Sequence, residues 1–169
     1  MTLIRQQKEQ YPDAILVDGG DFSMGSLFQT AYPTSAIELR MMGEMGYDAT
    51  TLGNHEFDYL PKGFASMLNV ASQYQTPAIV DANYWPGTHE DAALVTEAMM
   101  YYGIKDYILL ERGGIHYAIF GLVGYDSDAC APNSGMILED PAEAARQTVD
   151  QAVADCKATY GVEPIVIAL

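Results

Sequence analysis

The sequence predicts an α/β fold, because short apolar strands alternate with amphipathic helices along all 169 residues. Two of the expected strands end in polar, glycine-containing loops, as strands do where a sheet meets its ligands. No Ser/Gly linker and no internal repeat divides the chain. The length suits one domain, which would bury roughly 70% of its unfolded surface.

The first half of the chain reads as two strand–helix pairs. The apolar runs at residues 14–17 and 48–52 are expected to be strands, because each stops at a glycine-containing loop. Helices are expected over residues 33–45 and 61–71, where apolar side chains recur every three or four positions. Residues 1–10 are expected to form a short polar helix ahead of the first pair.

The second half is expected to contain a further strand, an irregular segment and a hairpin. The strand covers residues 77–80, and the irregular segment covers residues 83–103. Residues 107–111 and 115–123 read as two strands joined by the turn pair Gly113-Gly114, which favours a tight hairpin.

The last part of the chain predicts a helix and a strand. Asp140-Pro141-Ala142-Glu143 is a helix start, with a capping Asp, Pro at the first position and Glu three residues after the cap. The expected apolar face is Ala145, Val149, Ala152, Val153 and Cys156. Residues 164–169 read as an apolar strand. The two cysteines, Cys130 and Cys156, form no C-x-x-C pair and are expected to be unpaired, which leaves the redox compartment open.

The charge of the chain excludes several classes of partner. The net charge is −15, from 23 acidic and 8 basic residues. The electric field of so many negative charges repels nucleic acid polymers and anionic lipid. The sequence also contains no run of about 18 apolar residues, the length that a membrane-spanning helix needs. An acidic protein that handles phosphate needs local positive charge, which bound divalent cations supply.

Two loops carry the residues suited to chemistry. The segments Asp18–Gly25 and Leu52–Asp58 each follow an expected strand, so they would line one crevice at the carboxyl ends of the sheet. Asp21, Asn54 and His55 there offer a carboxylate, an amide oxygen and an imidazole, which suit divalent metals. Each residue alone has an ordinary structural interpretation; their joint occurrence favours a site.

These motifs resemble those of a known family. Gly20-Asp21 followed by Gly53-Asn54-His55-Glu56 resembles the signature of the calcineurin-like metallophosphoesterases. The longer run Leu52–Asp58 looks like the 5′-nucleotidase and 2′,3′-cyclic-nucleotide phosphodiesterase branch of that family. The resemblance implies a four-layer α/β/β/α sandwich with mixed sheets.

The resemblance also implies roles for the site residues. Asp21 would bridge two divalent metal ions, and Asn54 would bind the second of them through its side-chain oxygen. His55 would lie near the leaving oxygen, where it stabilises charge or donates a proton. Glu56 and Asp58 would orient the loop. The oxygen ligands do not distinguish Mn, Zn, Fe, Mg or Ca.

Several parts of the family pattern have no counterpart in residues 1–169. The pattern opens with a strand and Asp-x-His, and it adds histidines from later loops; a separate domain holds the substrate. We therefore expect a partial catalytic domain that binds metal weakly or not at all and is inactive alone. An exposed sheet edge would allow two copies to pair.

The predicted function is the hydrolysis of nucleotides or other small phosphate esters by the complete protein, in the cell envelope or outside the cell. Nucleotide sugars, other phosphodiesters or thiosulfate esters remain alternative substrates within the class. Two further alternatives are a noncatalytic binding or assembly module that has lost the metal centre, and a site completed by a second polypeptide.

Overall fold

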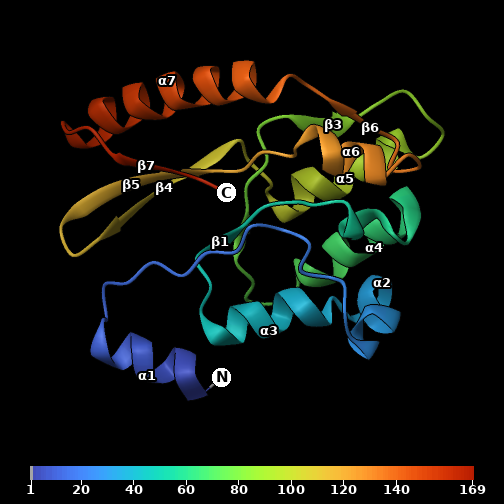
Figure 1. Ribbon diagram of the computed structural model, residues 1–169, viewed down its shortest axis with the longest axis horizontal. Helices are drawn as coiled ribbons and strands as arrows, with labels where there is room; N and C mark the ends of the chain where they lie inside the picture. Colours follow the sequence, from blue (N-terminus) through green and yellow to red (C-terminus); the bar gives the residue numbers. More distant parts are fainter. Residues whose placement is uncertain (1) are drawn as a thin grey trace.

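The computed structural model describes residues 2–169 and shows a mixed α/β protein, as the sequence predicts (Figure 1). The strands are β1 Ala49–Thr50, β2 Ala78–Ile79, β3 Tyr84–Pro86, β4 Tyr107–Arg112, β5 Ile115–Phe120, β6 Met136–Leu138 and β7 Ile165–Ala168. The α-helices are α1 Thr2–Gln10, α2 Tyr32–Ser35, α3 Ile37–Met45, α4 Leu60–Ala71, α5 Ala92–Tyr102, α6 Tyr125–Cys130 and α7 Pro141–Tyr160. Two 3₁₀ helices are η1 Leu27–Ala31 and η2 His55–Phe57.

Among the described residues the strands form three short sheets, of which one is parallel, one is antiparallel and one is mixed. β1 pairs in parallel with β2, and a parallel bridge from Val17 to Ala49 adds the preceding segment. β5 pairs antiparallel with β4 and parallel with β7, while β3 pairs antiparallel with β6. The loops after Val17 and β1 therefore leave the sheet at the same edge.

Helices enclose the core. In Figure 1 helix α7 runs along the sheet of β4, β5 and β7, and α3, α4 and α5 lie in the other half of the molecule. Residues from α3, α4 and α5 form the main apolar cluster, in which Phe64, Met67 and Leu68 are fully buried. The expected stripe of the helix after Pro61 is thus confirmed.

The predicted hairpin and the long helix are also confirmed. Gly113 and Gly114 both have positive φ, 57° and 79°, as a two-residue hairpin turn of this kind requires. The Asp140 side chain accepts a hydrogen bond from the Glu143 N–H at 2.9 Å and caps α7. The face of α7 is turned slightly from the expected one: Ala144, Thr148, Ala152 and Cys156 are buried, and Ala145, Val149 and Val153 are half-buried.

Three predictions of local structure were wrong. The helix expected over residues 33–45 is divided at Ala36, whose φ of 44° is left-handed and separates α2 from α3. Residues 83–103 are not irregular, because they contain β3 and α5. α5 has apolar side chains on most of its surface, so it lacks the one-sided pattern that marks a helix. Residues 14–17 form only the bridge at Val17 rather than a strand.

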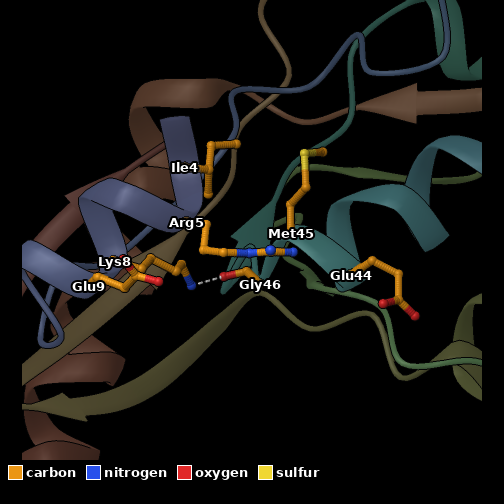
Figure 2. A pocket seen from close by; sticks show the side chains of 7 residues that line it. All are labelled: Ile4, Arg5, Lys8, Glu9, Glu44, Met45 and Gly46. Atoms are coloured by element: carbon orange, nitrogen blue, oxygen red, sulfur yellow. Dashed lines mark hydrogen bonds between the residues drawn. The ribbon is translucent and has the colours of Figure 1, made fainter. Parts of the chain in front are cut away.

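Helix α1 confirms the expected polar helix over residues 2–10; Met1 lies outside the described residues. No residue of α1 is buried. Figure 2 shows Arg5 and Lys8 reaching from α1 toward the end of α3, where the Lys8 ammonium donates to the Gly46 carbonyl. Among residues 2–169 there is no helix with the length and apolar character needed to cross a bilayer.

Candidate functional site

A strained turn presents Asp21. Asp18 begins this turn, since its Oδ2 accepts hydrogen bonds from the Gly20 N–H at 3.0 Å and the Thr50 hydroxyl at 2.8 Å. Gly20 and Asp21 then adopt φ of 88° and 56°, and the second value is unusual for a residue with a side chain. A Cβ at Gly20 would lie 2.8 Å from the Leu52 carbonyl carbon, so glycine lets the two loops touch. Backbone strain of this kind concentrates at functional sites.

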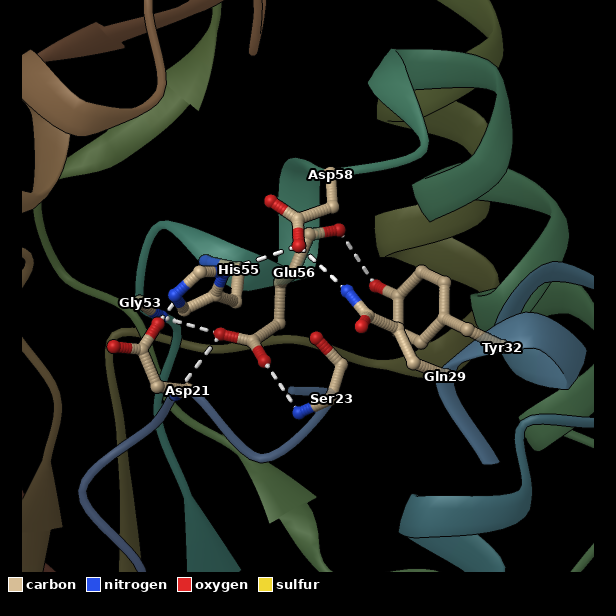
Figure 3. A network of polar contacts seen from close by, with 8 residues as sticks. All are labelled: Asp21, Ser23, Gln29, Tyr32, Gly53, His55, Glu56 and Asp58. Atoms are coloured by element: carbon tan, nitrogen blue, oxygen red, sulfur yellow. Dashed lines mark hydrogen bonds and ion pairs between the residues drawn. The ribbon is translucent and has the colours of Figure 1, made fainter. Parts of the chain in front are cut away.

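A buried carboxylate joins the two loops. Glu56 is fully buried in η2, and its oxygens accept N–H bonds from Gly53 at 2.7 Å, Asp21 at 3.0 Å and Ser23 at 3.2 Å (Figure 3). Burial raises the pKa of Glu56 to about 7, although these N–H donors oppose the rise. Glu56 therefore orients both loops, which is the structural role expected for it.

Asp21 and His55 are brought into direct contact. The backbone N–H of His55 donates to Asp21 Oδ1 at 3.0 Å, across 34 positions of sequence. The His55 ring faces Asp58, and its Nδ1 lies 3.0 Å from Asp58 Oδ2. The hydrogen bond to Asp58 raises the pKa of His55, which favours the charged imidazolium.

Asn54 directly precedes His55 in the second loop. It is half-buried at the start of η2, and its side chain caps no N–H in the described part of the chain. Its amide oxygen is thus free for another partner. All three predicted site residues, Asp21, Asn54 and His55, therefore lie in two adjoining loops.

The donor set fits one side of a metal centre. The Asp21 carboxylate and the Asn54 amide offer hard oxygen donors, which suit divalent cations. Glycine at position 53 makes room for the carboxylate, because a Cβ there would lie 2.2 Å from Asp21 Oδ1. Within residues 2–169 no group of three or more His, Cys, Asp or Glu side chains is arranged to hold a metal ion.

A second polar cluster was missed by the sequence reasoning. Asp81 and Asn83 follow β2 and are fully buried. Asp81 Oδ1 accepts the N–H groups of Asn83 at 3.3 Å and Tyr84 at 3.1 Å. Asn83 in turn bonds the Val123 N–H at 2.8 Å and carbonyl at 3.0 Å, and the Glu139 carbonyl at 3.2 Å. The signal available in sequence was a carboxylate and an amide directly after a strand.

The remaining histidines lie elsewhere. His89 Nδ1 accepts the Asp91 N–H at 3.2 Å, and its ring lies against Gly135. His116 stacks on Tyr160 with ring centroids 4.4 Å apart. Both have structural partners away from the two loops.

The sequence is similar to those of known nucleotide phosphoesterases and 5′-nucleotidases. It is 32% identical over 169 aligned residues to the trifunctional nucleotide phosphoesterase protein YfkN of Bacillus subtilis, covering 88% of this chain and 12% of that protein. It is 28% identical over 154 residues to the 5′-nucleotidase of Rattus norvegicus, covering 89% of this chain and 24% of that enzyme. No protein-family model matches the sequence.

Solved structures agree. A 5′-nucleotidase precursor from Thermus thermophilus matches with a TM-score of 0.73 and 25% identity, over 98% of this chain and 30% of that one. The calcineurin-like phosphoesterase structure of YfkN from Bacillus subtilis matches with a TM-score of 0.70 and 21% identity, over 99% of this chain and 51% of that one.

The fold is the mixed α/β fold of the calcineurin-like phosphoesterases. The chain belongs to the calcineurin-like phosphoesterase family, a family of hydrolases, in its 5′-nucleotidase branch. It spans about a tenth to a quarter of the length of the curated relatives described above.

Proposed function

We propose that the protein hydrolyses phosphate esters of nucleotides, either a 5′-nucleotide or a 2′,3′-cyclic nucleotide, with the help of two divalent metal ions. The observation that carries this proposal is the contact between Asp21 and His55, whose N···Oδ1 distance is 3.0 Å. This backbone contact joins the loop of Asp21 to the loop that carries Asn54 and His55. A carboxylate, an amide and an imidazole therefore belong to two loops that meet at one edge of the sheet, where α/β folds bind ligands.

Each residue has a role in the proposed reaction. Asp21 and Asn54 would hold the metal ions through their side-chain oxygens. When bound, the metal ions would polarise the phosphoryl group and supply positive charge. His55 would stabilise or protonate the leaving oxygen, and its raised pKa favours the protonated form that can donate. Asp58 holds Nδ1 of His55, which leaves Nε2 as the free ring nitrogen.

We expect residues 1–169 to act as part of a larger catalytic unit. Two oxygen ligands without a histidine would hold metal weakly, so we expect little or no activity from this chain alone. The small share of its relatives' length that it spans supports this view. We also expect the complete protein to be exported to the cell envelope or secreted, and the only support for this location is the family resemblance. Pairing of two copies through a sheet edge is a further expectation, which size-exclusion chromatography tests.

A noncatalytic binding or assembly module is the second candidate. The lack of a three-ligand His, Cys, Asp or Glu group among residues 2–169 favours it. The preserved contacts of Asp21, His55 and Glu56 count against it, because a module without catalysis has no need for a strained Asp21.

Two assays with Mn²⁺ distinguish the two candidates: phosphate release from AMP, and opening of a 2′,3′-cyclic nucleotide to the nucleoside monophosphate. Each assay compares this chain with a form extended at both ends to the length of its relatives. Activity of the extended form that is lost in Asp21→Ala, Asn54→Ala and His55→Ala would support the hydrolase. Hydrolysis by residues 1–169 alone would contradict the expectation that this chain has too few metal ligands. No hydrolysis by either form would favour the noncatalytic module.

A further inference from the structure

Gln29 reaches the candidate site from a different element. It lies in η1, is half-buried, and donates from Nε2 to Asp58 Oδ2 at 2.6 Å. The same carboxylate oxygen lies 3.0 Å from His55 Nδ1. Figure 3 shows the Gln29 amide and the His55 ring on either side of Asp58.

Asp58 needs such a second contact to be held still. Its side chain is 37% exposed, so a carboxylate with a single partner there would rotate and exchange that partner for water. Two donors on one oxygen, from separate elements, define its position. The Gln29 amide is neutral, so it orients Asp58 without cancelling the negative charge that attracts the Nδ1–H of His55.

Gln29 is itself fixed by its surroundings. Ser26 caps η1 by accepting the Phe28 N–H at 3.2 Å, and the Thr30 hydroxyl donates to the Leu27 carbonyl at 2.7 Å. Directly after η1, the buried Tyr32 hydroxyl donates to the Glu56 carbonyl at 2.7 Å. The segment that carries Gln29 is thus tied to the same turn that carries His55 and Asp58.

We propose that Gln29 is a positioning residue of this site: it holds Asp58, and through Asp58 it fixes the tautomer and the orientation of the His55 ring. An ionised carboxylate can only accept, so Nδ1 carries a proton in the neutral ring and in the imidazolium alike, and Nε2 is left for the substrate. The structural part of this inference stands on the contacts alone, and its catalytic consequence rests on the proposed function.

The test compares two matched variants. Gln29→Met removes the amide donor and keeps the length of the side chain. Gln151→Met is the control, because Gln151 Nε2 donates to Asp155 Oδ1 at 2.8 Å on α7, and Asp155 also accepts a second donor, the Tyr107 hydroxyl. The two variants therefore lose the same kind of bond at different places.

The first readout is the imidazole nitrogen spectrum of His55, recorded by NMR on residues 1–169 at a pH above the pKa of His55, where the ring is neutral and its tautomer is defined. In the wild type and in Gln151→Met we expect one tautomer with a protected Nδ1–H. In Gln29→Met we expect a mixture of tautomers and loss of the protected proton. An unchanged His55 spectrum in Gln29→Met would overturn the inference, whether or not the protein hydrolyses anything.

The second readout is hydrolysis by the extended form. Gln29→Met should lower kcat about tenfold at unchanged KM, the scale typical of residues that orient a functional group. In an Asp58→Asn background, Gln29→Met should have no further effect on kcat, since its route of action is already removed. Additive losses would contradict the inference. A wild type without hydrolysis would contradict the proposed function instead, while the NMR comparison would still decide the role of Gln29.

Discussion

The buried carboxylate of Glu56 accepts the backbone N–H of Asp21 at 3.0 Å, from a position 35 residues later in the chain. Glu56 also accepts the N–H groups of Ser23 and Gly53, so one side chain sets the distance between the two loops of the site. Asp21, Asn54 and His55, which have the proposed chemical roles, are exposed or half-buried. Glu56, which arranges their loops, is buried. The stability of the loops and the geometry of the site therefore depend on the same residue.

Glu56→Gln is expected to destabilise the protein by about 1–3 kcal/mol, because an amide NH₂ would face at least one of these buried N–H donors and leave it unpaired. Chemical denaturation measures the loss. Glu163→Gln is the control, since Glu163 is an exposed residue paired with Lys157 and should change little. Equal effects of the two substitutions would contradict the role given to Glu56.

Asp21 combines a proposed metal-binding carboxylate with a left-handed backbone, and two substitutions separate these properties. Asp21→Ala and Asp21→Gly both remove the carboxylate and should both abolish hydrolysis by the extended form. Glycine adopts a φ near 56° without strain, so Asp21→Gly should be more stable than Asp21→Ala by about 1 kcal/mol. Equal denaturation midpoints would show that the turn relaxes when the side chain is lost.

The sequence predicted the parts of the structure that depend on local pattern. The hairpin at Gly113-Gly114 and the capped start of α7 follow from residues next to one another, and both are present. The division of the helix at Ala36 could not be predicted, because alanine favours a helix and only tertiary packing forces its φ of 44°. The hydrogen bond between Gln29 and Asp58 could not be predicted either, because no local sequence pattern indicates a contact across 29 residues.

Gly53→Ala tests how closely the two loops approach. A Cβ at Gly53 would lie 2.2 Å from Asp21 Oδ1 and 2.9 Å from the Asp21 nitrogen, so the carboxylate would have to move. We expect about a 100-fold loss of hydrolysis by the extended form, the scale typical of a misplacement near 1 Å. Gly19→Ala is the control, because a Cβ at Gly19 meets nothing within 4 Å. Similar activities of the two variants would contradict the close approach.

Asp81 should make the stability of the protein depend on pH. Burial raises the pKa of Asp81 to about 8, and the charges of Asp106 and Glu139 add to the rise. In the unfolded chain the pKa of an aspartate is about 3.9. Between these two values the folded state binds a proton that the unfolded state has released, so the free energy of unfolding falls as pH rises toward 8.

Asp81→Asn removes this titration and keeps an oxygen to accept the N–H groups of Asn83 and Tyr84. The wild type should therefore lose stability relative to Asp81→Asn by up to about 1.4 kcal/mol for each pH unit between pH 5 and 8. Urea denaturation of both proteins across this range measures the difference. Parallel stability curves would mean that Asp81 is ionised in the folded protein, and that the buried carboxylate has a partner beyond the two N–H groups described for it.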